Sequence, residues 1–316
     1  MSYFHLNLIL QGKLTVCCLL MLSVMPLNAQ REAKQIGDFK ESISLNEHLR
    51  GTKRTLQYRP DGDEFVCVNG KNRYTRALYG SHSPFRVETS DRPVFAFYNN
   101  GRGGNISFKV ILRDGTELAL DCTGHCESRY SAGKRTYYLT DPSWGKGELR
   151  ISVLALADMD GAIWRFSPSN MPKGAILRWQ HGGATGKRLS RNGDMGVDPA
   201  DCFELPVEAT DLVTGELPLQ KEVYLVRGEV PEGYNVRKLY QQAEAASLAL
   251  ASHLKIETPD PYLNTLGGAL VAAADGIWDG QVWLHGAIGW RMPLSGWRAG
   301  YTGDALGWHD RARTHF

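Results

Sequence analysis

The fold is decided by the stretch RISVLALADMDGAIWRFS, residues 150–167. Two extended, largely apolar runs in this stretch flank the pair Asp160-Gly161. An Asp-Gly pair between extended runs is a strong signal for a β-hairpin, because both residues tolerate the positive φ angles that a tight turn requires. The stretch therefore predicts two antiparallel strands joined by a short turn.

The same pattern recurs on the N-terminal side of this stretch. FVCVNGKNRYTRALYG (65–80) contains Asn69-Gly70, and ISFKVILRDGTELAL (106–120) contains Asp114-Gly115. Further strand candidates are RPVFAFYN (92–99), KRTYYLT (134–140), GAILRWQ (174–180) and EVYLVRG (222–228). Many short strands joined by Gly-rich or Asp-rich turns are typical of an antiparallel sandwich. We therefore predict a mainly β protein with a β-sandwich domain over residues 55–233.

The spacing of apolar residues changes after residue 233. In NVRKLYQQAEAASLALASHLK (235–255) apolar residues recur every three or four positions, which predicts a linker helix over residues 234–256. Asp260 and Pro261 suit the N-cap and first position of a second helix. Its Gly267-Gly268 pair predicts close packing against a neighbour. The apolar face that we expect consists of Leu263, Leu266, Gly267, Leu270, Ala273 and Ile277.

Composition limits the class of protein. The 316 residues include 36 Lys and Arg against 34 Asp and Glu, and 42% are hydrophobic. These are ordinary globular values, which excludes a disordered chain or a multi-span membrane protein. With a formal net charge of +2 and no basic stripe, we expect no nucleic acid partner.

Residues 1–29 have the pattern of a secretory signal peptide. Lys13 precedes an apolar run, Leu14–Leu27, that is too short to cross a ~30 Å hydrocarbon core as a helix. We therefore expect a periplasmic or secreted protein without a membrane span after cleavage, in which residues 30–54 form a lead-in segment. A short N-terminal anchor and a lipoprotein are weaker alternatives.

Four cysteines follow the predicted signal peptide. An oxidising compartment allows disulfides, and CTGHC (122–126) is tight enough for a local bridge. The alternative is buried free thiols. Zinc is a poor interpretation because no second ligand pair lies at zinc spacing, so we expect no metal and no cofactor. The four residues are Cys67, Cys122, Cys126 and Cys202.

Three segments carry a resemblance to known families. The order of a sandwich, a linker helix and then helices joined by Trp-rich loops is similar to six-hairpin carbohydrate enzymes, which pair a sandwich with an (α/α)6 barrel. GWRMPLSGWRAGYTGDALGWHDRARTHF (289–316) resembles part of the first hairpin of such a barrel. NGKNRYTRALYGSHSPFRVE (69–88) and RPVFAFYNNGRGGNISF (92–108) resemble an exported family, common in Bacteroidetes, named only as a domain of unknown function. The resemblance implies that residues 257–316 begin a barrel that the chain leaves incomplete.

The resemblance directs the search for a site to the Trp-rich stretch. Residues 281–303 are predicted as a loop, followed by a third helix for which Asp304 is a good N-cap. Aromatic faces and Arg side chains suit sugar rings and their hydroxyl groups. The alternative is that these Trp residues serve packing and the charges are solvated ion pairs. The predicted substrate-binding residues are Trp290, Arg291, Trp297, Arg298, His309 and, from the sandwich, Arg76.

Glycoside hydrolysis usually needs two carboxyl groups that flank the scissile bond. Asp304 and Asp310 are weak candidates, because six residues of one helix place them on different faces. Asp304 also competes for the N-cap role, and Asp279 could approach across a hairpin. The catalytic residues are therefore unknown at this stage.

Three functions stay open. The first is an exported glycoside hydrolase-like protein that acts on a complex polysaccharide and is inactive as a fragment. The second is a non-catalytic carbohydrate-binding sandwich. The third is another six-hairpin activity, a polysaccharide lyase using Tyr301 and His309 or a phosphorylase. In all three the partner is a poly- or oligosaccharide, and an uncovered helix face predicts self-association.

Overall fold

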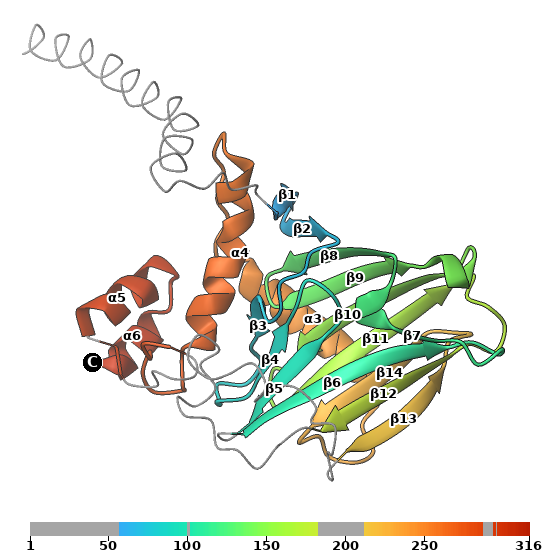
Figure 1. Cartoon of the computed structure of the whole chain (residues 1–316). Helices are drawn as coiled ribbons and strands as arrows, with labels where there is room; N and C mark the ends of the chain where they lie inside the picture. The colour runs from blue at the N-terminus through green and yellow to red at the C-terminus, as the bar shows by residue number, and fades with distance from the viewer. Residues whose placement is uncertain (1–56, 100–101, 183–211, 287–292, 295) are drawn as a thin grey trace, which may run out of the picture. The chain divides into compact units, whose positions relative to one another are not determined.

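Two antiparallel sheets build the larger part of the protein (Figure 1). The computed structural model describes residues 57–99, 102–182, 212–286, 293–294 and 296–316. The first sheet has the strand order β1 (Arg59–Asp61), β2 (Glu64–Val68), β8 (His125–Ser131), β9 (Lys134–Thr140), β10 (Glu148–Ala155), β11 (Gly161–Ser169) and β14 (Val223–Gly228). The second has the order β13 (Val213–Pro218), β12 (Ile176–Gly182), β6 (Arg102–Ile111), β5 (Phe95–Asn99), β4 (Arg86–Thr89) and β3 (Arg76–Leu78), and β7 (Glu117–Ala119) pairs with β6.

The facing sides of the two sheets form an aromatic core. Trp164 on β11 is fully buried, and its ring centroid lies 5.6 Å from that of Phe95 and 5.7 Å from that of Phe97. Phe108 on β6 completes this group at 6.2 Å. Burying each such side chain contributes roughly 1.5–3 kcal/mol. The predicted antiparallel β-sandwich is therefore confirmed for the described residues.

Two of the three predicted hairpins are confirmed. β10 and β11 pair in register from Glu148↔Ser169 to Ala155↔Ala162, around the turn that ends at Asp160. β6 and β7 pair around Asp114-Gly115, and Gly115 has φ +88°, the left-handed conformation that favours glycine.

The hairpin predicted at Asn69-Gly70 is wrong. β2 and β3 lie in different sheets, so this pair begins a crossover between them. The Asn69 backbone N–H donates to the Cys126 carbonyl at 2.8 Å, and its side-chain oxygen accepts from the Cys126 N–H at 2.9 Å. A Cβ at position 70 would lie 2.4 Å from Oδ2 of the buried Asp91. Tertiary contacts with β8 and Asp91 therefore override the local turn signal.

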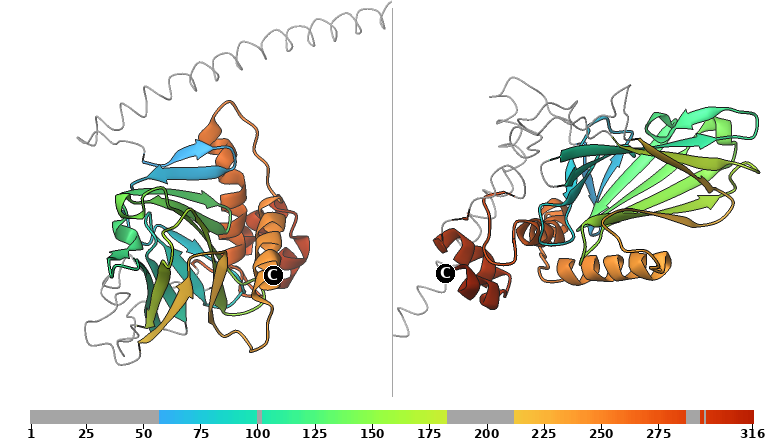
Figure 2. Two further views of the ribbon diagram at one scale, coloured as in Figure 1. Left: turned by 90° about the vertical axis from the view of Figure 1, so that its right-hand side faces the viewer. Right: turned by 90° about the horizontal axis from the view of Figure 1, so that it is seen from below.

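Helix α3 (Val236–Ala251) covers part of the outer face of the first sheet (Figure 2). Its N-cap, Asn235, accepts a hydrogen bond from the Lys238 N–H at 3.0 Å. Leu239, Tyr240 and Ala243 pack on residues of β10 and β11. The predicted helix is confirmed, although it ends five residues before the predicted boundary at 256.

Helix α4 (Pro261–Gly276) begins as predicted, because the Asp260 side chain accepts from the Tyr262 N–H at 2.8 Å. The close packing predicted at the glycine pair is also present: a Cβ on Gly267 would lie 2.7 Å from the Leu254 carbonyl oxygen, and one on Gly268 would lie 3.0 Å from Cβ of Ala132.

The predicted apolar face of α4 is buried only in part. Leu263 and Leu270 are 47% and 50% exposed, and Ala273 is also exposed. The glycine pair sets the helix rotation, because it is the side that approaches a neighbouring backbone. The buried residues are Thr265, Gly267, Val271, Ala272 and Asp275.

The loop predicted over 281–303 and the N-cap predicted at Asp304 need correction. α5 (Gly296–Ala305) starts inside the predicted loop and contains Asp304 near its end, and α6 starts only at residue 309 (His309–His315). Glycine disfavours helix, yet Gly303 allows α5 to pack closely, since a Cβ there would lie 2.9 Å from Trp283 and Ala312 side-chain atoms. Packing therefore stabilises a helix that propensity does not predict.

Only some of the remaining predictions concern residues that the structure describes. The predicted signal peptide and lead-in segment, like Cys202, lie outside them. Cys67, Cys122 and Cys126 are free thiols, so the local 122–126 bridge is absent. No described helix combines the length and apolar character needed to cross a membrane. Four α-helices are described. The relationship of residues 257–316 to an (α/α)6 barrel stays a prediction.

Substituting Gly267→Ala tests the close approach of α4 to Leu254. Alanine normally stabilises a helix by about 1 kcal/mol relative to glycine. Here we expect the free energy of unfolding to fall by about 1–3 kcal/mol, because the new Cβ overlaps a backbone oxygen. Urea unfolding followed by circular dichroism measures the change, and Leu270→Ala on the exposed side should shift it by less than about 0.5 kcal/mol. An unchanged or raised stability of the Gly267→Ala protein would contradict the packing described.

Candidate functional site

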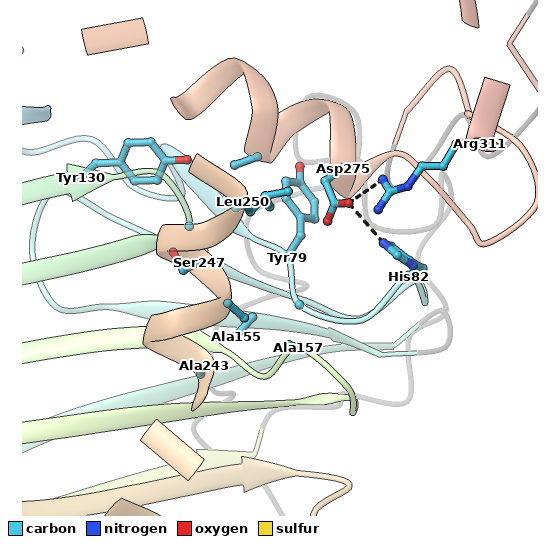
Figure 3. A pocket seen from close by; sticks show the side chains of 15 residues that line it. Tyr79, His82, Tyr130, Ala155, Ala157, Ala243, Ser247, Leu250, Asp275 and Arg311 are labelled. Atoms are coloured by element: carbon cyan, nitrogen blue, oxygen red, sulfur yellow. Dashed lines mark hydrogen bonds and ion pairs between the residues drawn. The ribbon is translucent and has the colours of Figure 1, made fainter. Parts of the chain in front are cut away.

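A cavity of about 220 Å³ lies between the sandwich and the helices (Figure 3). Small side chains from β10, α3 and α4 leave this space open, while Asp275, His82 and Arg311 meet at one end. Typical pockets for drug-sized ligands measure about 300–1,000 Å³, so this cavity suits a single small unit. Its polar and aromatic lining consists of Tyr79, His82, Tyr130, Ser247, Asp275 and Arg311.

Asp275 is the centre of the polar end. Its Oδ1 accepts a hydrogen bond from Arg311 Nη1 at 2.7 Å and from His82 Nε2 at 3.3 Å. The three residues come from the last turn of α4, from α6 and from the loop that follows β3, and Figure 3 shows them converging. The cluster thus connects segments that are 193 and 36 residues apart in sequence.

The surroundings keep Asp275 ionised. Burial raises the pKa of this carboxyl group, but the hydrogen bonds from His82 and Arg311 and the positive charge of Arg311 lower it by more, so that the pKa lies below its ordinary value of 3.8. An ionised carboxylate can accept hydrogen bonds or a proton. It cannot serve as the protonated general acid of a hydrolase near neutral pH.

Two tryptophans hold the Arg311 side chain in place. Its guanidinium carbon lies 4.4 Å from the ring centroid of Trp308 and 5.6 Å from that of Trp278. Trp278 and the fully buried Trp283 pack together at 4.7 Å between centroids. Cation–π contacts of this kind contribute about 0.5–2 kcal/mol. The packing of these three tryptophans therefore positions the cation.

The loop that carries His82 is fixed on both sides. Oδ1 of Asp160 accepts hydrogen bonds from the hydroxyl groups of Ser81, at 2.6 Å, and of Ser83. On the other side the Tyr79 ring packs against Gly276, where a Cβ would lie only 2.4 Å away. Burial is the main cause of the raised pKa of the Tyr79 hydroxyl. Tyr79 is therefore a neutral hydrogen-bonding group at neutral pH.

Tyr130 lines the cavity together with Ser247 of α3. Burial raises the pKa of the Tyr130 hydroxyl, which therefore stays neutral. The guanidinium carbon of Arg76, a predicted substrate-binding residue, lies 5.7 Å from the Tyr130 ring centroid, and Arg76 Nη1 donates to the Thr75 carbonyl. Arg76 thus contacts a lining residue from outside.

The other predicted binding residues lie on α5 and α6 or outside the described residues. Trp290 and Arg291 belong to the second group. Trp297 is 60% exposed on α5, with the Arg298 guanidinium carbon 4.9 Å above its ring and Tyr301 packed edge-on at 5.9 Å. Both rings are exposed, and the substrate-binding role predicted for Trp297 and Arg298 stays a prediction.

The candidate carboxylates are both exposed. Oδ1 of Asp304 lies 3.1 Å from Nδ1 of His309, and Asp310 Oδ1 lies 2.7 Å from Arg313 Nη2. The Asp310 side chain is 96% exposed, whereas a general acid needs burial to stay protonated. Their catalytic role, and the lyase pair of Tyr301 and His309, stay predictions.

Sequence reasoning missed the residues that the structure brings together. His82 lay in a Ser-His-Ser stretch without an evident acid, and its partner Asp275 is distant in sequence. The one available signal was a lone acidic residue in the apolar segment GALVAAADG (268–276). Asp275 is the only carboxylate among the described residues that line the cavity, and no group of three or more metal-ligating side chains occurs in the described parts of the chain.

Replacing Asp275→Asn should change the pH dependence of stability. The pKa of Asp275 is lower in the folded state than its ordinary value of 3.8. The ionised carboxylate therefore makes its full contribution to stability at pH values above this ordinary pKa. That contribution is lost as the pH falls through the lowered pKa. We expect the variant to be about 1–3 kcal/mol less stable near neutral pH, with the difference disappearing in acid.

Urea unfolding midpoints across this pH range measure the effect, with the exposed Asp310→Asn as the matched control, for which we expect no measurable difference. A stability difference between wild type and Asp275→Asn that stays constant down to the most acid condition would contradict an ionised Asp275.

Comparison with known proteins gives one family match. Residues 100–229 match a protein-family profile described as a domain of unknown function (DUF4450). The matched range spans most of the sandwich, from β6 to β14. It agrees with the part of the resemblance that concerned a domain of unknown function. A search of curated proteins finds no match.

Proposed function

We propose that the protein is an exported, glycoside hydrolase-like protein that binds a complex polysaccharide, and that the cavity beside Asp275 holds one sugar unit of it. The observation that carries the proposal is the hydrogen-bonded cluster of Asp275, Arg311 and His82 at one end of a small cavity. Export rests on the signal-peptide pattern of residues 1–29 and is part of the proposal.

The cluster combines the two kinds of group that sugar hydroxyls need. The Asp275 carboxylate accepts hydrogen bonds, and the Arg311 guanidinium has further N–H groups beyond the one used at 2.7 Å. The His82 side chain is 38% exposed, so a ligand can reach this end. Charge-assisted hydrogen bonds are about twice as strong as neutral ones, which favours binding of a hydroxyl-rich ligand here.

Binding without turnover is the role that these groups can fill. Hydrolysis usually uses two carboxyl groups, one protonated and one ionised. The described lining supplies one, Asp275, and its lowered pKa suits the ionised partner. A hydrolytic reaction would use Asp275 as base or nucleophile and would require a second, protonated carboxyl group. We therefore expect saccharide binding with little release of reducing sugar.

The test is affinity electrophoresis of the full chain against a panel of neutral and acidic plant and host polysaccharides. We expect retardation by at least one polymer. Arg311→Ala and His82→Ala should lower that affinity about tenfold or more, since each removes a hydrogen-bonding group worth about 1.4 kcal/mol or more. Arg313→Ala is the matched control on the same helix, because its side chain is 77% exposed and pairs only with the exposed Asp310 among the described residues.

Two outcomes would overturn the proposal. One is the absence of binding to every polymer by a folded wild-type protein. The other is retardation that is unchanged in both the Arg311→Ala and His82→Ala proteins. Robust release of sugar by the wild type would keep the site but contradict the expected lack of turnover.

Self-association through exposed helices is also part of the proposal. Leu263 and Leu270 lie half exposed on α4, where they would form the contact. Light scattering of the wild type should give a mass above that of a monomer at high concentration, and the double variant Leu263→Ser, Leu270→Ser should shift it toward the monomer. A concentration-independent monomer would contradict self-association.

A further inference from the structure

A second depression lies on the outer face of the first sheet. Its volume is about 420 Å³, and it crosses four adjacent strands, β8, β9, β10 and β11. We propose that this depression, here called the strand groove, is a second saccharide-binding site, which takes an oligosaccharide segment of a polysaccharide. The inference does not depend on the function proposed for the cavity beside Asp275.

The pairing register places hydrogen-bonding side chains across the groove in two rows. The first row consists of His125, Thr140, Glu148 and Ser169, which pair directly across the four strands. The second row consists of Tyr138, Arg150 and Ser167. Glu127 of β8 continues this row outside the groove lining, where its carboxylate accepts a hydrogen bond from Arg129 Nε at 2.6 Å. Because alternate residues of a strand share one face, both rows point away from the core. The groove is thus a polar strip perpendicular to the strands.

The central side chains are available to a ligand. Arg150 and Glu148 are exposed, and neither forms an ion pair or a side-chain hydrogen bond within the parts of the chain that the structure describes. The Arg150 guanidinium carbon lies 5.3 Å from the ring centroid of Tyr138, which limits its freedom. The Arg150 guanidinium, a cationic donor, and the Glu148 carboxylate, an anionic acceptor, therefore lie two residues apart on the same face of β10.

This combination selects the class of ligand. A polyanion would be repelled by Glu148, and a polycation would be repelled by Arg150. Sugar hydroxyls both donate and accept, so a mixed row of carboxylate, guanidinium, hydroxyl and imidazole groups is complementary to them. The two rows cross four strands, and a linear oligosaccharide would contact successive strands as it crossed them.

Within the described parts of the chain, no helix covers the groove at this end of the sheet. The Asp141 side chain accepts from the Gly124 N–H at 2.9 Å, which ties the start of β8 to the end of β9 and fixes His125 beside Thr140. Helix α3 covers the other end of the same face, where Glu244 pairs with Lys134 at the start of β9. Because the paired strands already fix the backbone of these residues, binding requires no ordering of the backbone, which favours affinity.

The experiment isolates the groove by working in the full chain with Asp275→Asn, so that the cavity beside position 275 is disabled. Affinity electrophoresis and calorimetry use the same neutral and acidic polysaccharides. We expect the Asp275→Asn protein to retain binding of at least one neutral polymer, and Arg150→Ala or Glu148→Gln in that background to raise its Kd about tenfold.

Matched controls come from the outer face of the other sheet. Arg178→Ala and Glu216→Gln remove an exposed pair from β12 and β13, and each should leave the Kd within about twofold. Apart from the Asp275→Asn background itself, the substituted side chains are exposed or partly exposed, and circular dichroism verifies that every variant, the background included, folds. Tyr138→Ala is a further variant that should weaken binding, because it removes the ring that orients Arg150.

Two results would overturn the second site. The first is the loss of all saccharide binding in the Asp275→Asn protein. This result would mean that the cavity beside Asp275 accounts for all of the binding. The second is retained binding that neither Arg150→Ala nor Glu148→Gln weakens. Failure of the cavity alone is distinguishable, since the Asp275→Asn protein then binds as tightly as the wild type and Arg150→Ala still weakens the binding; a wild type that binds no polymer overturns both sites.

Discussion

The hydrogen bonds to Asp275 are the constraint on which the arrangement of sandwich and helices depends. One carboxylate, 9% exposed, receives Arg311 from α6 and His82 from a sandwich loop. A buried charge that lost these partners would cost several kcal/mol, so α4, α6 and the loop are stable only in an arrangement that keeps all three groups together. The same arrangement encloses the cavity and directs its polar groups inward (Figure 3).

Small residues and aromatic rings make this arrangement geometrically accessible. Glycines at positions 267, 268 and 276 allow α4 to approach Leu254, Ala132 and Tyr79 more closely than larger residues would permit. The buried tryptophans 278 and 283, together with Trp308, then hold Arg311 at the required distance. Interiors are close-packed, and a shift in one of these contacts would therefore be transmitted to Asp275. The packing and the electrostatics support each other.

More of the fold than of the candidate site could be predicted from the sequence. The hairpins at Asp114 and Asp160 and the helix cap at Asp260 depend on local chemistry, so local patterns predict them. The crossover at Asn69 and the helix over Gly296–Ala305 depend on distant contacts, and local patterns gave the wrong result there. The cluster of His82, Asp275 and Arg311 requires three remote segments to meet, which one sequence cannot reveal.

The central claim is that Asp275 couples the loop of His82 to helix α6. Amide hydrogen exchange compared between wild type and Asp275→Asn measures this coupling most directly. We expect faster exchange in residues 79–83 and 309–315 of the variant, with unchanged protection in the β9–β11 core. Unchanged exchange in either segment, or a uniform increase across the whole sandwich, would contradict it.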